Sequence, residues 1–252
     1  MSPRARPAQS PLRQDYRIQT HKPEATIKVM ALDVDDYDSV RRFTKQSRKE
    51  IPAVHLLILN ADIGLLQLER SPSGHDCTTQ VNYYSSWVGS RAHENPIFDK
   101  KTPIKTGEGV LTHMDKEENS VPLQRYGDSK LFYVLFLYSL APRLDPKKVI
   151  ITMMCPDMVN NNMSDALPLH LCWIVNIVKA IPARPVEPGS WIILNSTLVV
   201  DLESHGKFLV DKNMADKAAF IKSPAGQEIQ RKLREETIAE MSKLTTFPAE
   251  LG

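Results

Sequence analysis

Cysteine is scarce in this chain of 252 residues, and the three that occur, Cys77, Cys155 and Cys172, lie far apart. No two of them form a CxxC pair, and no histidine lies near one at the spacing of metal ligands. Cysteines separated in this way are typical of packed thiols in a reducing compartment. We therefore expect no metal ion and no disulfide framework.

Long apolar runs are also missing. The best candidate, "LPLHLCWIVNIVKAI", is shorter than the ~18 residues that span a bilayer and contains His170, Asn176 and Lys179. The N-terminal segment "MSPRARPAQSPLRQDYR" has no apolar core for a secretory signal, which leaves a transit peptide or a disordered arm. We favour an irregular or disordered arm over residues 1–25, and we expect a cytoplasmic protein without a membrane partner.

An excess of charge of one sign is the third missing feature. Lysine and arginine number 32 against 30 aspartates and glutamates, and the net charge is +2. A nucleic-acid partner is therefore not expected. Apolar residues make up 42% and charged residues 25%, as in ordinary soluble domains, and the length suits one domain with its own core over residues 26–252.

Three apolar stretches predict buried strands, and a fourth stretch near the C-terminus predicts a late strand. They are Thr26–Val34, Val54–Asn60, Lys147–Cys155 and "HGKFLVD" at His205–Asp211.

Helices are predicted between and after these strands from period, caps and charge placement. They are "DDYDSVRRFTKQSRKE", a helix start at "CTTQVNYYSSW", "LQRYGDSKLFYVLFLYSLA", apolar text near 167–181, and a last helix from Ser223–Pro224 to about Leu244. His93–Arg125 has no period and is expected to be loop-like. Alternating strands and helices predict an α/β fold with a mainly parallel sheet and helices on both faces.

Six short motifs occur along the chain: "LDV", "LNADIG", "QVNYYSSW", "VGSRAH", "YGDSK" and "CPDMVNNNM". In this order they resemble the short-chain dehydrogenase/reductase family, and most closely its fungal, retinol-dehydrogenase-like branch. The likeness covers about residues 26–245 and includes the tail motifs "SHGKFLVD" and "SPAGQEIQRKLREE". A YxxxK pair alone is a weak signal, whereas six ordered motifs are specific. The resemblance implies a Rossmann-like fold.

The resemblance also implies four catalytic residues. Tyr126 would pass a proton to or from the substrate oxygen, and Lys130 would lower the pKa of Tyr126 and hold the nicotinamide ribose. Ser90 would fix the carbonyl oxygen, and Asn82 would keep a water relay in place. The alternatives are a solvated helix rim for Tyr126 and Lys130, which lie one helical turn apart, and a turn hydroxyl for Ser90.

NADP or NAD is the cofactor that the resemblance implies, and the stretch that would distinguish the two is not found. Besides Tyr126 and Lys130, three further residues would belong to the cofactor site. Asp33 would contact the adenine ring, Asn60 would support the central strand, and Val159 would follow the Pro156–Asp157 turn. Asp33 has the alternative of being a helix N-cap.

Glycine is missing where this family needs it, because the first glycine of the chain is Gly64. Only about 25 residues precede Thr26, whereas a βαβ unit needs ~30, so the glycine-rich phosphate loop is not encoded ahead of that strand. Seven residues separate Asn82 from Ser90, too few for a helical crossover of ~10–12 residues. We therefore predict a truncated Rossmann-like domain, incomplete at its N-terminal strands. Either Ser90 has left its family position or the strand presenting it is lost.

Two further glycine positions of the family hold aspartates here, Asp62 and Asp157. Each adds bulk and places negative charge near the cofactor phosphates, which Coulomb repulsion disfavours. Loss of early strands would also expose the apolar edge of "VHLLILN". We therefore expect incomplete folding or a homodimer that covers this edge.

Three functions remain open at this point. The first is an NAD(P)-dependent oxidoreductase acting on a carbonyl or alcohol of a small apolar metabolite, which fungal secondary metabolism would supply. The second is an inactive family member or an interaction module. The third is acid/base chemistry by Tyr126 and Lys130 without a cofactor.

Overall fold

The computed structural model describes residues 22, 24–85, 87–96, 101–121, 124–160, 183–199 and 201–246. The chain forms two compact units, one from the residues up to Asp33 with Asp38–Pro52, the other from Val34–Tyr37 with Ala53–Gly252. The predicted arm of residues 1–25, except for residues 22, 24 and 25, and the predicted helix near 167–181 lie outside the described residues.

The smaller unit contains most of α2 (Tyr37–Glu50), the helix predicted from its charge pattern. Asp38 lies in its first turn and Arg48 and Lys49 in its last, where each charge complements the helix dipole. The extended chain before it is anchored by the Asp33 backbone N–H, which donates to Ser39 Oγ at 2.8 Å.

Thr26–Val34 is not a strand, so the prediction of a buried strand there is wrong. The segment is extended, but among the described residues it joins no sheet, and Val29 is 57% exposed. A strand is stabilised by ladder hydrogen bonds to its neighbours. The chain ahead of Thr26, rich in proline, was not predicted to supply such a neighbour.

The larger unit holds a mixed sheet of three short strands in the order β1-β2-β3. β1 (Met153–Cys155) pairs parallel with β2 (Phe208–Val210), and β2 pairs antiparallel with β3 (Asn213–Met214). β1 forms only the last three residues of the predicted strand Lys147–Cys155, while the late strand is confirmed. The parallel pair with its covering helices agrees with the predicted α/β class.

Val54–Asn60, the other predicted buried strand, is also not a strand in the structure. Its apolar side chains are exposed, with Val54 at 61% and Leu57 at 67%. One backbone hydrogen bond, from Trp87 N to Leu59 O at 2.7 Å, fastens it to the chain after α3. Apolar composition alone does not make this segment a strand, because a parallel strand needs hydrogen-bonded partner strands along its edges.

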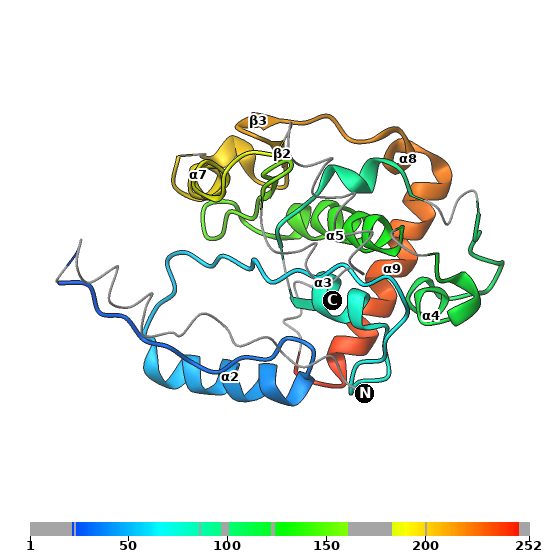
Figure 1. Ribbon diagram of the computed structural model, residues 1–252, viewed down its shortest axis with the longest axis horizontal. Coiled ribbons are helices and arrows are strands. Elements are labelled where there is room, and N and C mark those ends of the chain that lie inside the picture. The colour runs from blue at the N-terminus through cyan, green and yellow to red at the C-terminus, as the bar shows by residue number, and fades with distance from the viewer. Residues whose placement is uncertain are drawn as a thin grey trace. The chain divides into compact units, whose positions relative to one another are not determined.

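Helices supply most of the core of this unit, and α3 and α9 lie beside α5 in Figure 1. The bounds are α3 Cys77–Ser85, α4 Val110–Met114, α5 Arg125–Leu140, α7 Val186–Leu198, α8 Ala219–Lys222 and α9 Pro224–Ser242. Short 3-10 turns lie at Arg91–Glu94 (η1), Glu117–Asn119 (η2), Ala141–Arg143 (η3) and Leu202–Ser204 (η5), so the stretch predicted as loop is partly helical.

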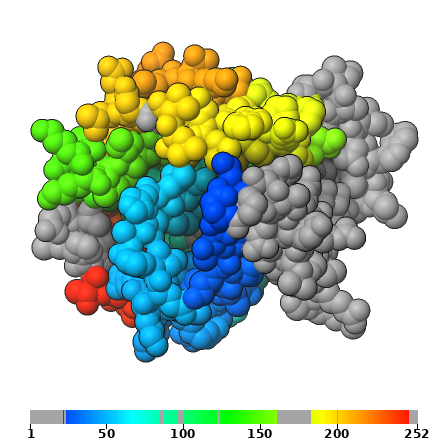
Figure 2. Space-filling model, turned by 90° about the vertical axis from the view of Figure 1, so that its left-hand side faces the viewer, coloured from blue at the N-terminus to red at the C-terminus, as the bar shows by residue number. Residues whose placement is uncertain are grey.

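α5 is the central element, apolar nearly all round after its first turn and buried along most of its length. Tyr83 of α3 packs edge-on against the rings of Phe132, Tyr133 and Phe136. α7 packs on the sheet through Ile192, which clusters with Met154 and Leu209. Its outer side is open, since Trp191 is 61% exposed, and this surface is drawn in yellow in Figure 2.

The last helix begins as the sequence predicts. Ser223 is the N-cap of α9, its hydroxyl accepts a hydrogen bond from Gly226 N at 3.1 Å, and Pro224 occupies the first turn. Glu236 of α9 accepts hydrogen bonds from the backbone N–H groups of Val110 and Leu111 at 2.8 and 2.9 Å, and so caps α4.

The thiols of Cys77 and Cys155 are free, as expected, and Cys172 lies outside the described residues. Burial raises the pKa of Cys77 to about 12, so it is not a ready nucleophile. Within the ranges that the structure describes, no helix is long and apolar enough to cross a membrane.

His75 connects two distant parts of the larger unit. Its Nδ1 lies 2.9 Å from Asp115 Oδ2 and its Nε2 lies 3.3 Å from Glu240 Oε1 on α9. The hydrogen bond to Asp115 raises the pKa of His75 above its ordinary value, against the effect of burial. Protonated His75 therefore stabilises the fold fully below the unfolded-state pKa of about 6.5, and this contribution is lost as pH rises through the folded-state pKa.

We expect His75→Gln to lower the free energy of unfolding by about 1.5 kcal/mol at pH 5.5, as for a hydrogen bond that involves charged groups. The loss should shrink as the pH rises through the folded-state pKa of His75 toward 8.5, because the imidazole then loses its charge in the folded state as well. Urea unfolding at the two pH values measures both losses. His55→Gln, at an exposed position, is the control, and an equal loss at both pH values would contradict the prediction.

Candidate active site

The first two turns of α5 bring together the tyrosine and lysine of the "YGDSK" motif. Lys130 Nζ lies 5.3 Å from the centroid of the Tyr126 ring, so the two side chains share one face of the helix, as their spacing predicts. Lys130 is fully buried, which is rare for a lysine and requires that its charge be compensated.

Asp62 provides this compensation. A single carboxylate oxygen, Asp62 Oδ2, accepts a hydrogen bond from the Tyr126 hydroxyl at 3.0 Å and lies 3.0 Å from Lys130 Nζ. Lys130 Nζ also donates to the backbone carbonyl of Val88 at 2.8 Å. The tyrosine and the lysine are thus joined through a carboxylate that belongs to the chain.

Asn82 of α3 holds the segment that carries Asp62. Its amide exchanges two hydrogen bonds with the backbone of Ile63, each 2.9 Å long, and donates a third to Ser129 Oγ at 3.1 Å. Ser129 in turn donates to Tyr126 O at 2.8 Å. Asn82, predicted to keep a relay in place, therefore connects α3, residue 63 and α5.

Ser90 lies beside Tyr126: burial and the charge of Asp62 raise the pKa of the phenol, and the Ser90 hydroxyl acts to lower it. The strand that would present Ser90 is reduced to a single bridge, in which Val88 pairs parallel with Met154 and Gly89 N donates to Met154 O at 2.8 Å. The single bridge does not decide between the two alternatives for Ser90, so both stay predictions. The Ser90 hydroxyl also accepts from Ala92 N at 3.2 Å and caps η1.

Gly127 allows this close approach. A Cβ atom at Gly127 would lie 3.0 Å from the carbonyl oxygen of Ala92, so only glycine lets the first turn of α5 contact η1 without displacement. This contact keeps Ser90 next to Tyr126.

The electrostatics differ from those that the family resemblance implies. Burial, followed by the negative charge of Asp62, raises the pKa of Tyr126 well above its usual value. That Lys130 lowers the pKa of Tyr126 stays a prediction, because burial and Asp62 outweigh any such effect in this structure. Burial lowers the pKa of Lys130 and raises that of Asp62, while the attraction between the two charges opposes both shifts. At neutral pH, Tyr126 is consequently a protonated phenol.

Two predicted cofactor residues, Asn60 and Val159, are not brought to this site by any contact within the described residues, and the third, Asp33, lies in another unit, the smaller one. Asn60 is exposed, two residues before Asp62. Val159 forms a parallel bridge with Arg184 and packs closely on Gly189 at the start of α7.

Asp157, the second aspartate at a family glycine position, keeps the backbone shape that glycine would favour. Its φ is 57°, in the left-handed region. Its carboxylate lies 3.6 Å from Arg184, so its charge is paired. It therefore differs from Asp62, which contacts the tyrosine and the lysine directly.

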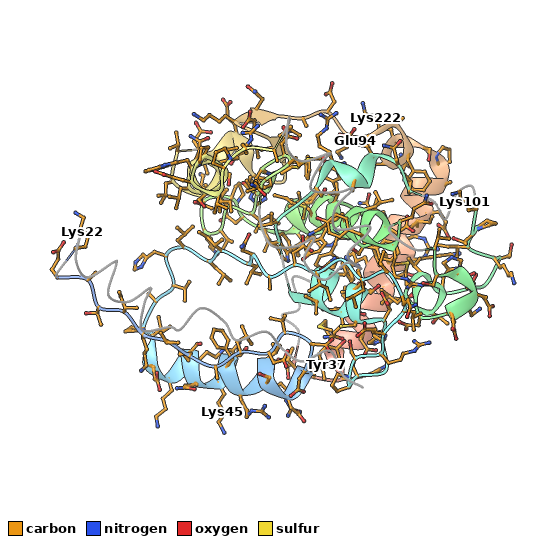
Figure 3. The ribbon with its side chains drawn as sticks, viewed as in Figure 1. Lys22, Tyr37, Lys45, Glu94, Lys101 and Lys222 are labelled. Carbon is orange, nitrogen blue, oxygen red and sulfur yellow. The ribbon has the colours of Figure 1, made fainter. Side chains whose placement is uncertain are left out.

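A cavity of about 570 Å³ is lined in part by Arg91, the residue that follows Ser90 in the sequence. Its lining includes Arg91, Glu94, Val210 and Asp216, and Glu94 is labelled in Figure 3. Tyr126, Lys130, Asn82 and Ser90 do not line this cavity. The stretch predicted to contact the substrate, about Met158–Pro168, lies mostly outside the described residues.

Asp62 is the residue whose role sequence reasoning missed. Its position was identified as a glycine position of the family, but its contact with Tyr126, 64 residues away along the chain, was not predicted. The available signal was the place of Asp62 two residues after Asn60 of the motif, where the resemblance implies that the backbone lies close to the cofactor.

Comparison with known proteins gives consistent matches. Residues 9–170 match the model of the short chain dehydrogenase family. Short chain dehydrogenase macD of Penicillium terrestre is 68% identical over 95% of this chain and 80% of its own length. Short chain dehydrogenase yanD of Aspergillus niger is 60% identical, over 94% of this chain and 79% of its own. Short-chain dehydrogenase/reductase tropG of Talaromyces stipitatus is 56% identical, over 96% of this chain and 80% of its own.

Proposed function

Because this chain belongs to the short-chain dehydrogenase family, we propose that it is an NAD(P)-dependent oxidoreductase that acts on a carbonyl or alcohol of a small apolar metabolite. The observation that supports this most is the placement of Tyr126 and Lys130 on one face of α5, with Ser90 beside the phenol. The matched relatives come from fungi, and we propose a substrate from secondary metabolism.

Each residue has a chemical role in this proposal. Tyr126, a neutral phenol at pH 7, donates its proton to the carbonyl oxygen in the reductive direction. The Ser90 hydroxyl holds that oxygen by a hydrogen bond. Asn82 acts through its hydrogen bonds to Ile63 and Ser129, and keeps α3 and α5 in register around the site.

The chemistry of the donors fits the ribose of a nicotinamide nucleotide. The Lys130 ammonium and the Tyr126 hydroxyl are two hydrogen-bond donors side by side, as a ribose diol requires, although the Asp62 carboxylate holds both in the structure. When bound, the nicotinamide would supply or accept the hydride at the substrate carbon. The residues that would hold the phosphates are not assigned.

The proposal is tested by titrating the purified chain with NADPH and, separately, with NADH. A nucleotide at ~100 times its Kd should raise the free energy of unfolding by about 2.7 kcal/mol, since it binds the folded state only. Differential scanning fluorimetry with each nucleotide, compared with an equal concentration of ATP, measures this. No specific shift with either nucleotide would contradict the proposal.

The second candidate is an inactive relative that binds another protein or a second copy of itself. The exposed apolar side chains of Val54, Leu56, Leu57 and Ile58 favour it. In that case the chain would associate through this segment, and neither nucleotide would change its stability. The same titration therefore separates the two candidates.

A further inference from the structure

The carboxylate of Asp62 engages both donors that the proposed function needs. Its Oδ2 atom lies 3.0 Å from the Tyr126 hydroxyl and 3.0 Å from Lys130 Nζ. The first donor would serve the substrate oxygen and the second would serve the nucleotide ribose. The single hydroxyl proton of Tyr126 is not available for a ligand while Asp62 holds it, and Asp62 and the Val88 carbonyl together engage two of the three N–H donors of Lys130.

The segment that carries Asp62 is held firmly in place. The backbone N–H of Ile63, the next residue, donates to Asn82 Oδ1, and the Ile63 carbonyl oxygen accepts from Asn82 Nδ2, both at 2.9 Å. On the other side, Leu59 O accepts from Trp87 N at 2.7 Å. A Cβ atom at Gly64 would lie 3.9 Å from the Tyr126 ring, so the chain beyond Asp62 also runs past this ring. The contact of Asp62 is therefore set by the backbone and not by a loose side chain.

One oxygen of the Asp62 carboxylate takes no part in these two contacts. Its second oxygen, Oδ1, is buried without a hydrogen-bond partner among the described residues. An unpaired buried acceptor costs free energy, and its negative charge would repel an approaching phosphate group. A ligand that needs the Tyr126 hydroxyl as its donor therefore has to displace the carboxylate from it.

We propose that Asp62 is an internal competitor of the nucleotide, whose carboxylate must leave Tyr126 and Lys130 before the nicotinamide ribose can be held there. The inference rests on the proposed function. Asp62 would then weaken the binding of the nicotinamide half of the nucleotide and not of the adenine half, because Asp62 contacts the groups that would hold the nicotinamide ribose.

The test compares two ligands in two variants. Asp62→Gly removes the side chain, and Asp62→Asn keeps its size and its acceptor oxygen but removes the charge, which preserves a folded protein if glycine does not. We expect isothermal titration calorimetry to show about tenfold tighter NADPH binding in either variant, which corresponds to about 1.4 kcal/mol. Binding of 2′,5′-ADP, which lacks the nicotinamide ribose, should stay within about twofold of wild type.

Asp157→Gly is the charge-matched control. It also removes an aspartate at a family glycine position, but one paired with Arg184, so it should leave the ratio of the NADPH and 2′,5′-ADP affinities unchanged. Suppose that wild type binds NADPH, and that in both Asp62 variants the affinity for NADPH changes by no more than the affinity for 2′,5′-ADP. The inference is then overturned, and the proposed function stands. If neither wild type nor any variant binds NADPH, NADH or 2′,5′-ADP, the proposed function fails, and the inference with it.

A readout without any nucleotide tests the contact itself. Spectrophotometric titration at 295 nm follows tyrosine ionisation, and the difference from Tyr126→Phe isolates Tyr126. In Asp62→Asn, Tyr126 should ionise at lower pH than in wild type, because the negative neighbour is gone. An unchanged Tyr126 titration would mean that the carboxylate does not contact the phenol in solution, which would overturn the inference.

Discussion

Tyr126→Phe is expected to lower kcat for reduction of a carbonyl substrate by about 10²- to 10⁴-fold, the usual range for loss of a general acid. The ring stays, so the packing of α5 is kept, and only the proton that Tyr126 would donate is removed. The hydrogen bond to Asp62 that the variant loses should cost only about 1 kcal/mol of stability. Steady-state kinetics and urea unfolding of the same preparations measure the two effects independently.

Tyr138→Phe is the matched control for this variant. Tyr138 lies on the same helix, and its ring is 4.2 Å from Lys217 Nζ, away from Asp62. Removing its hydroxyl should leave kcat within about twofold of wild type. If both variants lose activity equally, or if Tyr126→Phe keeps full activity while folded, then Tyr126 is not the proton donor.

The helices of this chain could be predicted from sequence because their signals are local. Ser223 and Pro224 at the start of α9, and the apolar run after Lys130 in α5, identify these helices without knowledge of the rest of the chain. The predicted contact of Tyr126 with Lys130 also follows from spacing within one helix. Local chemistry therefore predicted the part of the candidate site that lies on α5.

The strands and the third member of the site depend on partners far away in sequence. Val54–Asn60 has the composition of a strand, but strand formation requires neighbours that the structure does not provide within its described residues. Asp62 approaches Tyr126 because Asn82 fixes the next residue. No periodicity or motif encodes such an approach, which is a product of packing among α3, α5 and the chain between them.

Lys130→Met is expected to have the largest effect on stability, a loss of about 3 kcal/mol. The substitution keeps a long apolar stem but leaves the Asp62 charge without its ion-pair partner, and breaking a buried pair on one side costs ~3–5 kcal/mol. We expect the lower end of that range, because the Asp62 side chain is 18% exposed and can gain some hydration. Urea unfolding measures the loss, with Lys45→Met as control, since Lys45 is exposed on α2.

The double variant Lys130→Met/Asp62→Asn shows whether the loss comes from the stranded carboxylate. Neutralising Asp62 removes the charge that lacks a partner, so the double variant should be more stable than Lys130→Met alone, with a coupling of about 2 kcal/mol in the double-mutant cycle. Additive losses would mean that Lys130 and Asp62 do not interact. A coupling of the expected size would establish that the buried lysine of this site is stabilised by the same carboxylate that, by our proposal, a nucleotide has to displace.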